Sequence, residues 1–207
     1  MEKIDFKKKY KQLYKPSAKE FSIVEVPKMK FVMIDGEGEP GSKVYSNALQ
    51  WLYSVVYPIK FNAKKRLEKV FVVPPLQGLW WADDMGDFIK GNKEKWKWRM
   101  MIAVPDWVDN EMFEEGKAKA SKKLGDMPSS FRMEYFEEGK SVQIMHIGPY
   151  SEEAPTIAKL HNEFIPQNDL LENGHHHEIY LNDPRRTVPE KLKTVLRQPV
   201  KNIDVST

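Results

Sequence analysis

A carboxylate stands in a short apolar segment near the C-terminal end of the chain. The segment reads His177-Glu178-Ile179-Tyr180-Leu181, and its alternation predicts a strand. Side chains alternate across a strand, so Ile179 and Leu181 would face the helices while Glu178 and Tyr180 share the opposite face. If that face is apolar, partial desolvation raises the proton affinity of Glu178, which becomes a cation receptor or a base near neutral pH. The alternative is an edge strand with Glu178 in water.

Tryptophan is concentrated in two neighbouring segments of the first half. These are the pair Trp80-Trp81 and the alternating pair Trp96 and Trp98. If other apolar residues already pack against the helices on one face of the sheet, the additional tryptophans indicate a second apolar surface on the other face. An aromatic cleft of this kind binds flat or cationic organic molecules by stacking and cation–π attraction. The alternative is that all of these rings belong to an ordinary core.

The remaining chemistry-bearing residues predict neither a metal nor a cofactor. His175, His176 and His177 are consecutive, so a strand would direct them to alternate faces and one ion could not collect all three. The sequence has no cysteine, which excludes disulfides, thiolate nucleophiles and cysteine metal sites. It also lacks a complete dinucleotide fingerprint, a phosphate-binding P-loop and a serine nucleophile elbow.

The elements that must position these residues follow one order, strand, turn, helix and two strands, and this order occurs twice. In the first half, extended chain broken near Pro27 leads to a glycine-rich turn, with Ser42 as the expected helix N-cap. Helices are expected at 43–57, ending before Pro58, and at about 110–124; strands are expected at about 70–81 and 96–104.

The second half restarts at Phe131 with an extended stretch to Ile147, broken at Glu138-Gly139. A turn at Gly148 precedes a helix of about 152–164, with Ser151, Glu152 and Glu153 at its start, and strands near 175–181 and 194–200. Met33 and Gly36 align with Met145 and Gly148 at one constant offset of 112 residues. The shared break and turn predict a duplication, although alternating strands and helices also arise by chance.

The bulk composition is that of a folded globular protein, and the expected strands and helices give it the α+β class. The 207 residues are 41% hydrophobic and 12% aromatic, with a net charge of +3, a balance without the concentrated basic surface that nucleic-acid binding requires. Residues 1–20 alternate lysines with apolar residues at helical spacing and predict an amphipathic arm on the domain. With no bilayer-spanning apolar run and no signal-peptide core, the sequence predicts a cytoplasmic protein.

Several motifs resemble those of the GyrI-like small-molecule-binding superfamily, and the likeness runs from about residue 20 to the C-terminal end. The most specific is the run from Glu178 to Pro199, which resembles the ending of one branch of these proteins. His146-Ile147-Gly148-Pro149-Tyr150 is similar to the superfamily's H-x-G-x-Y turn. The segments Ile34–Gly38 and Gly78–Trp81 match the same branch.

The resemblance implies a duplicated βαββ fold of the SHS2 type, an antiparallel sheet with helices on one face and a ligand pocket between the halves. The expected organisation is an arm at 1–20 and a domain at 21–205, with halves of about 21–125 and 131–200. In effector domains of the superfamily a glutamate on a late strand binds cationic drugs among aromatics, and Glu178 is at the matching place. In hydrolases that open the cyclopropane of DNA-alkylating compounds, a pocket glutamate activates water.

By resemblance, Glu178 and Trp80 are the expected catalytic residues, with Trp81, Trp98, Tyr150 and Tyr180 as ligand contacts. Two interpretations remain open: a hydrolase of strained cyclopropanoid compounds, and a non-catalytic module that senses or sequesters cationic or aromatic ligands. Some 20 residues precede the domain, too few for the helix-turn-helix of the regulators, so no direct nucleic-acid binding is expected. We also expect no membrane association and a monomer or weak homodimer.

Overall fold

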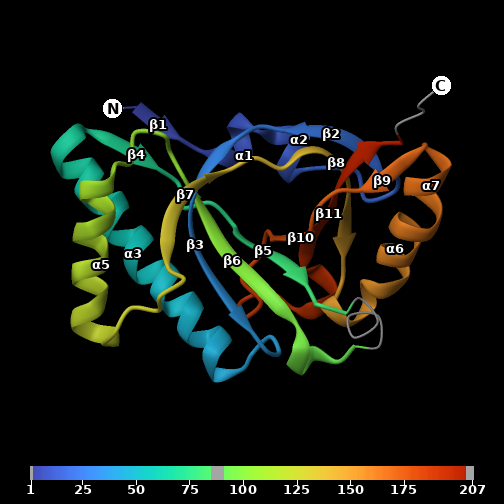
Figure 1. Ribbon diagram of the computed structural model, residues 1–207. Helices are drawn as coiled ribbons and strands as arrows, with labels where there is room; N and C mark the ends of the chain where they lie inside the picture. The colour runs from blue at the N-terminus through green and yellow to red at the C-terminus, as the bar shows by residue number, and fades with distance from the viewer. Residues whose placement is uncertain (1, 85–90, 204–207) are drawn as a thin grey trace. The chain divides into compact units, whose positions relative to one another are not determined.

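The computed structural model describes residues 2–84 and 91–203, and the chain divides into two compact units. The first unit consists of Met1–Lys9 and Met29–Phe136, and the second of Tyr10–Lys28 and Glu137–Thr207. Each unit contains an antiparallel sheet and helices (Figure 1). The predicted α+β class is therefore confirmed.

The sheet of the first unit has the strand order β5-β6-β3-β7, with antiparallel pairing throughout. Its strands are β3 (Met29–Glu37), β5 (Leu76–Trp81), β6 (Lys97–Val104) and β7 (Arg132–Phe136). Two short strands, β1 (Glu2–Ile4) and β4 (Lys69–Phe71), pair in parallel beside it. The central strands β3 and β6 are nearly continuous runs of buried apolar residues, as expected for strands covered on both faces.

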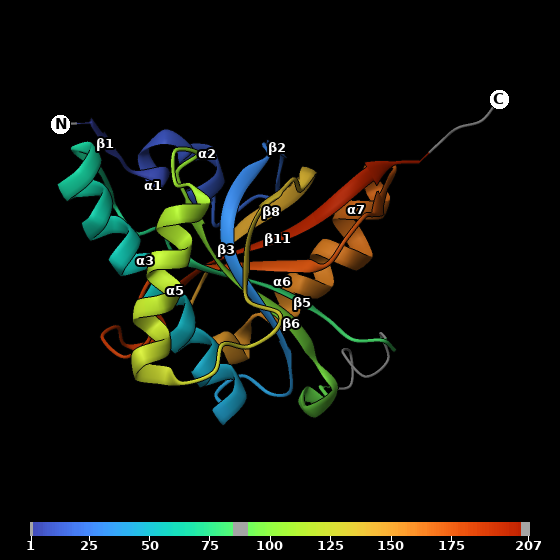
Figure 2. The same ribbon diagram turned by 60° about the vertical axis from the view of Figure 1, so that its left-hand side comes forward.

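Two helices, α3 (Lys43–Leu67) and α5 (Asn110–Leu124), run side by side in the first unit (Figure 2). The apolar stripe of α3, which includes Trp51, Val55 and Ile59, is fully buried. At Gly116 of α5 an added Cβ would lie 3.0 Å from a methyl carbon of Val55. Glycine therefore permits the close approach of α5 to α3.

Helix α3 is longer than the sequence predicts. The expected end before Pro58 is wrong, because the helix continues through Pro58 to Leu67 and ends at Glu68 in the left-handed region. Proline removes one helical hydrogen bond, but Ile59 and Ala63 beyond it are fully buried. Burial of this continued apolar stripe offsets the local loss. The predicted N-cap is confirmed, since Ser42 accepts a hydrogen bond from the amide of Tyr45.

The sheet of the second unit has the strand order β2-β8-β11-β10, also antiparallel, and β9 extends it by pairing with the far end of β11. Its strands are β2 (Ser22–Val26), β8 (Gly139–Ile147), β9 (Leu170–Glu172), β10 (His176–Tyr180) and β11 (Lys193–Asn202). Helix α6 (Ala154–Lys159), a π-helical turn (Leu160–Phe164) and α7 (Ile165–Gln167) follow one another along it (Figure 1). Leu160 and Ile165 from this helical segment form a core with Val142, Leu170 and Val200.

Short 3-10 turns complete the described elements, at Lys93–Lys95, Tyr150–Glu152 and Pro189–Lys191. The predicted strand breaks near Pro27 and at Glu138-Gly139 are confirmed by the gaps β2–β3 and β7–β8. The expected strand 70–81 is instead two strands, β4 and β5, because Pro74 and Pro75 cannot donate ladder hydrogen bonds. Part of the connection between the strands expected at about 70–81 and 96–104 lies outside the described residues.

Apart from the short strands β4 and β9 and short helical turns, each unit has the order strand, helix, strand, strand, in β3-α3-β5-β6 and in β8-α6-β10-β11. Within each unit the last of these strands lies between the first and the second, β6 between β3 and β5 and β11 between β8 and β10. This order is the one that a duplicated βαββ unit would have, and the duplication itself stays a prediction.

The N-terminal segment has the amphipathic character that its sequence indicates. It forms α1 (Phe6–Lys9) and α2 (Lys11–Tyr14), which bury Phe6, Leu13 and Tyr14 and leave their lysines exposed. None of the helices in the described part of the chain is long and apolar enough to cross a membrane.

Candidate functional site

Strand β10 brings Glu178 and Tyr180 together on one face of the second unit's sheet. Tyr180 donates a hydrogen bond of 2.6 Å from its hydroxyl to Glu178 Oε2, and Ile179 between them is fully buried on the other face. The alternation predicted from the sequence is therefore confirmed. On the other side of the carboxylate, His176 Nε2 lies 3.4 Å from Glu178 Oε1.

A second carboxyl group, that of Glu153, lies close enough to Glu178 for their charges to interact. Glu153 is buried, and its Oε1 accepts no hydrogen bond from the described residues. Burial, followed by the negative charge of Glu178, raises the pKa of Glu153 to about 9, and the neighbouring Thr194 hydroxyl opposes this rise. At neutral pH Glu153 therefore carries a proton and is an acid beside Glu178.

The turn before Glu153 places a phenol at the same site. His146 Nε2 lies 3.1 Å from the carbonyl oxygen of Pro149, and Gly148 has a φ of 140°, so both residues fix the turn that presents Tyr150. The rings of Tyr150 and Tyr180 meet edge to face with centroids 5.7 Å apart. Burial and the negative charges of Glu153 and Glu178 raise the pKa of Tyr150 to about 12. Its hydroxyl is therefore a hydrogen-bond donor at all ordinary pH values.

Two of the three expected aromatic residues of the first unit, Trp80 and Trp98, lie together around Tyr45. Trp80 and Trp98 are cross-strand partners on β5 and β6. The ring of Trp80 stacks on Tyr45, with centroids 6.1 Å apart, and the ring of Trp98 meets Tyr45 edge to face at 5.4 Å. Trp98 is fully buried beneath Gly36, where an added Cβ would overlap its ring. Trp81 is half-buried.

A buried ion network on the opposite face of β10 was not recognised from the sequence. Glu138 accepts a hydrogen bond of 2.8 Å from His177 Nδ1 and one of 3.0 Å from Arg197 Nη1. Burial works against ionisation of Glu138, but His177 and Arg197 outweigh it and lower its pKa to about 2. Burial lowers the pKa of His177, so its ring is neutral and donates from Nδ1.

The structure thus brings Glu178, Tyr150 and Tyr180 together in the second unit. In the first unit it brings Trp80 and Trp98 together around Tyr45, whereas Trp81, the next residue on β5, faces the other side of the strand. From the sequence Glu153 was expected only at the start of a helix, and its burial close to Glu178 was not predicted. The helix has no side-chain cap. Among the described residues, no group of three or more acidic or histidine side chains is arranged to hold a metal ion.

Comparisons with known proteins agree with this architecture. The family model described as the GyrI-like small molecule binding domain matches residues 19–201. Among proteins with curated descriptions, the comparison finds no match.

Three solved structures illustrate the range of similarity. An uncharacterized conserved protein from Listeria innocua is 42% identical, with a TM-score of 0.84, over 96% of this chain and 100% of its own. A structure described as a hydrolase from Listeria innocua is 41% identical, with a TM-score of 0.81 and the same coverage. The C-terminal domain of EcmrR shares the fold at 12% identity and a TM-score of 0.55, over 89% of this chain and 98% of that domain.

Proposed function

The chain belongs to the GyrI-like small-molecule-binding family, and we propose that its ligand is an amphipathic aromatic compound whose strained ring is hydrolysed at Glu178 and Glu153. The observation that carries the proposal is the buried, protonated Glu153 beside Glu178. Glu153 holds a proton at neutral pH because burial and Glu178 raise its pKa to about 9. An enzyme that adds water to an electrophile needs one base and one acid, and this pair supplies both.

The proposed reaction is the addition of one water molecule across a cyclopropane conjugated to a carbonyl. Glu178 accepts a proton from water as the water oxygen bonds to a cyclopropane carbon. One ring C–C bond breaks, and its electron pair moves through the conjugated system to the carbonyl oxygen, which takes the proton of Glu153. Transfer of a proton from Glu178 to Glu153 then restores the starting state. The Tyr150 hydroxyl, which stays protonated, is suited to orient the oxygen that gains charge.

Solved structures of similar sequence support a hydrolytic activity. Two solved structures described as hydrolases from Listeria innocua are each 41% identical to this chain and are covered over their full length. Cyclopropanoid compounds are the proposed substrate class because they are electrophiles that water can open with acid–base assistance alone, and cell protection from such genotoxins is the proposed role.

A second function, non-catalytic binding of cationic or aromatic compounds, is favoured by the surroundings of the carboxylate. The ring of Tyr180 and its hydrogen-bonded Glu178 lie next to the ring of Tyr150. The carboxylate attracts an organic cation by charge, and the neighbouring aromatic rings attract it by cation–π interaction. In the first unit we propose Trp80 and Trp81 as ligand contacts, and we propose that Trp98, the cross-strand partner of Trp80, fixes the position of Trp80.

The test is incubation of the purified protein with a duocarmycin-type spirocyclopropyl compound, followed by mass spectrometry of the product. The proposal expects a product heavier by one water, formed faster than without protein, and loss of that activity in Glu178→Gln. The exposed neighbour provides a matched control, and Glu152→Gln should retain the activity. Trp81→Ala should weaken ligand binding, measured by fluorescence titration.

The outcomes separate the two functions. Ring opening at the uncatalysed rate, with tight binding of cationic ligands that Glu178→Gln abolishes, would leave the binding function and reject the hydrolase. Equal ring opening by the wild-type protein and Glu178→Gln would reject the catalytic role of this carboxylate.

A further inference from the structure

Three aromatic rings follow one another along an exposed side of α3 in the first unit. Tyr53, Tyr57 and Phe61 are spaced four residues apart, and their ring centroids are separated by 6.2 and 6.4 Å in turn. Tyr57 is 44% exposed and Phe61 is 55% exposed. This aromatic row takes no part in the site around Glu178, so its exposure needs a separate explanation.

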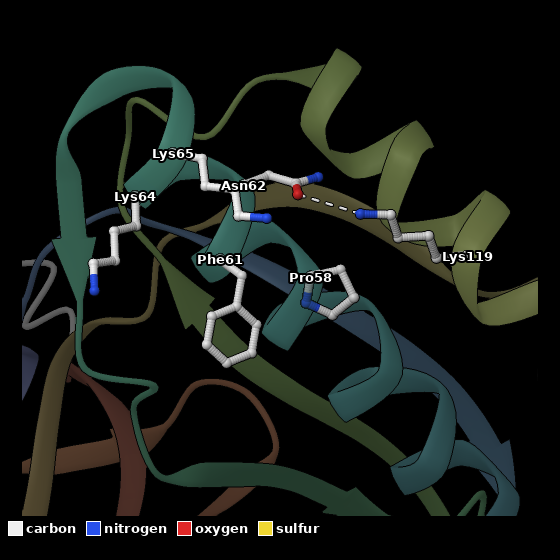
Figure 3. A pocket seen from close by; sticks show the side chains of 6 residues that line it. All are labelled: Pro58, Phe61, Asn62, Lys64, Lys65 and Lys119. Atoms are coloured by element: carbon white, nitrogen blue, oxygen red, sulfur yellow. Dashed lines mark hydrogen bonds between the residues drawn. The ribbon is translucent and has the colours of Figure 1, made fainter.

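The row borders a groove between α3 and α5 that has two adjoining hollows. One, of about 610 Å³, is lined by Pro58, Phe61, Asn62 and three lysines (Figure 3). The other, of about 540 Å³, is lined by Tyr53, Tyr57 and Pro58 together with residues of α5. Pro58 and Lys119 contribute to both hollows, which therefore adjoin along one groove.

The charge of the groove is of one sign. Its lysines come from both helices and are Lys64, Lys65, Lys119, Lys122 and Lys123. Among the described residues, no carboxylate lines either hollow. The carboxylates of α5 at one end, Glu111 and Glu115, are already paired with Arg66 at 3.0 and 2.7 Å. Within the described residues Lys64, Lys65, Lys122 and Lys123 form no ion pair, so their charge is available to a partner.

We propose that this groove docks an acidic amphipathic segment of a partner protein. The aromatic row supplies an apolar floor and the lysines of both helices supply a basic rim, so the complement is a segment with apolar residues on one side and carboxylates on the other. Residues 53–65 of α3 extend over roughly 18 Å, the length of a helical segment of about three turns. A concave groove between two helices accommodates such a segment better than the flat surface of a membrane does.

The direct test uses a fluorescein-labelled helical peptide of about 15 residues, with leucine at helical spacing and glutamate at its other positions. Fluorescence anisotropy should show saturable binding that weakens as salt is raised from about 50 to about 200 mM. Tyr57→Ser with Phe61→Ser should weaken binding by roughly tenfold or more. Lys122→Glu with Lys123→Glu should weaken it similarly and reduce its salt dependence.

Matched controls lie on the same unit. Lys7→Glu with Lys8→Glu changes exposed lysines of α1, and Tyr135→Ser removes another exposed ring; both should bind the peptide as the wild type does. Circular dichroism verifies the fold of every variant. Glu178→Gln should also bind the peptide normally, so a failure of the proposed hydrolase leaves this inference intact.

Several results would overturn the proposal. One is that the acidic peptide shows no binding, and another is that a peptide with lysine in place of glutamate binds as tightly as the acidic one. A third such result is that the control variants lose as much binding as the groove variants do. Association with phosphatidylglycerol vesicles but not with the peptide would assign the groove to a membrane surface instead and reject a protein partner.

Discussion

The second unit buries two glutamates, Glu138 and Glu153, that reach opposite protonation states. Glu138 is held by His177 and Arg197, and its pKa is lowered from 4.5 to about 2. Glu153 has no cationic partner among the causes of its shift, faces the charge of Glu178, and has its pKa raised to about 9. Both are less than a tenth exposed, at 8% and 5%, so burial alone does not decide the outcome.

The difference lies in what surrounds each carboxyl group. Around Glu138 both oxygens receive hydrogen bonds, and Arg197 also donates to the carbonyl oxygen of Leu13. These contacts fix the N-terminal segment to the sheet, which is a structural task. Around Glu153 one oxygen has no partner within the described residues. A buried polar atom left in this state is a mark of a site that binds or reacts.

The largest effect is expected from Glu138→Gln. The substitution leaves Arg197 buried without its counter-charge, and we expect a loss of roughly 3–5 kcal/mol in the free energy of unfolding. Urea denaturation measures this loss, and the exposed Glu137→Gln is the control. An equally small change in both variants would contradict the structural role of the network.

The dependence of stability on pH under acid conditions tests the same network. The pKa of Glu138 is lower in the folded protein than in the unfolded chain. Its contribution to the free energy of unfolding is therefore complete above pH 4.5 and is lost as pH falls from there toward about 2. His177 acts in the same direction, because burial lowers its pKa below 6.5 and its contribution is lost as pH falls below that value. Unfolding midpoints should therefore fall progressively under acid in the wild type.

Glu178→Gln should have the largest effect on function, with little effect on stability. If Glu178 is the base of the proposed reaction, turnover should fall by about 100-fold or more. In the binding function, affinity for cationic ligands should fall while affinity for neutral analogues stays. Steady-state rates and fluorescence titrations distinguish the two results. If Glu178→Gln destabilised the protein as much as Glu138→Gln, Glu178 would have a structural role like that of Glu138.

Part of this site was predictable from local alternation, and part was not. The shared face of Glu178 and Tyr180 follows from the period of one strand. Glu153 could not be assigned, because its burial depends on strand β11, whose Thr194 lies 41 residues further along the chain. The pairing of Glu138 with Arg197, 59 residues apart, escaped for the same reason.

At the level of the fold, turns and strand breaks were predictable because glycine and proline act locally. The passage of α3 through Pro58 was not, because it depends on the tertiary burial of Ile59 and Ala63. Local signals identify where elements begin, and packing decides how far they continue.

Glu153→Gln should stabilise the protein, the opposite of Glu138→Gln. The folded pKa of Glu153 lies above the unfolded value of 4.5, so its stabilising contribution is complete below 4.5 and is lost as pH rises toward about 9. Glutamine removes this dependence, and we expect a gain of about 1–3 kcal/mol near neutral pH. Urea denaturation at several pH values measures it. A loss of stability instead would show that Glu153, like Glu138, has a structural role.

Tyr180→Phe should have the smallest effect. It removes the hydroxyl that donates a 2.6 Å hydrogen bond to Glu178 and leaves the ring that meets Tyr150. A hydrogen bond to a charged group contributes about 1.5–3 kcal/mol, but the half-buried site allows water to replace part of it, so we expect roughly 1 kcal/mol. That corresponds to about a fivefold change in cation affinity or turnover. Isothermal titration measures the change, with the exposed Tyr135→Phe as the control. A loss as large as that of Glu178→Gln would show that the phenol itself reacts with the ligand, and that the acid of the site is Tyr180 and not Glu153.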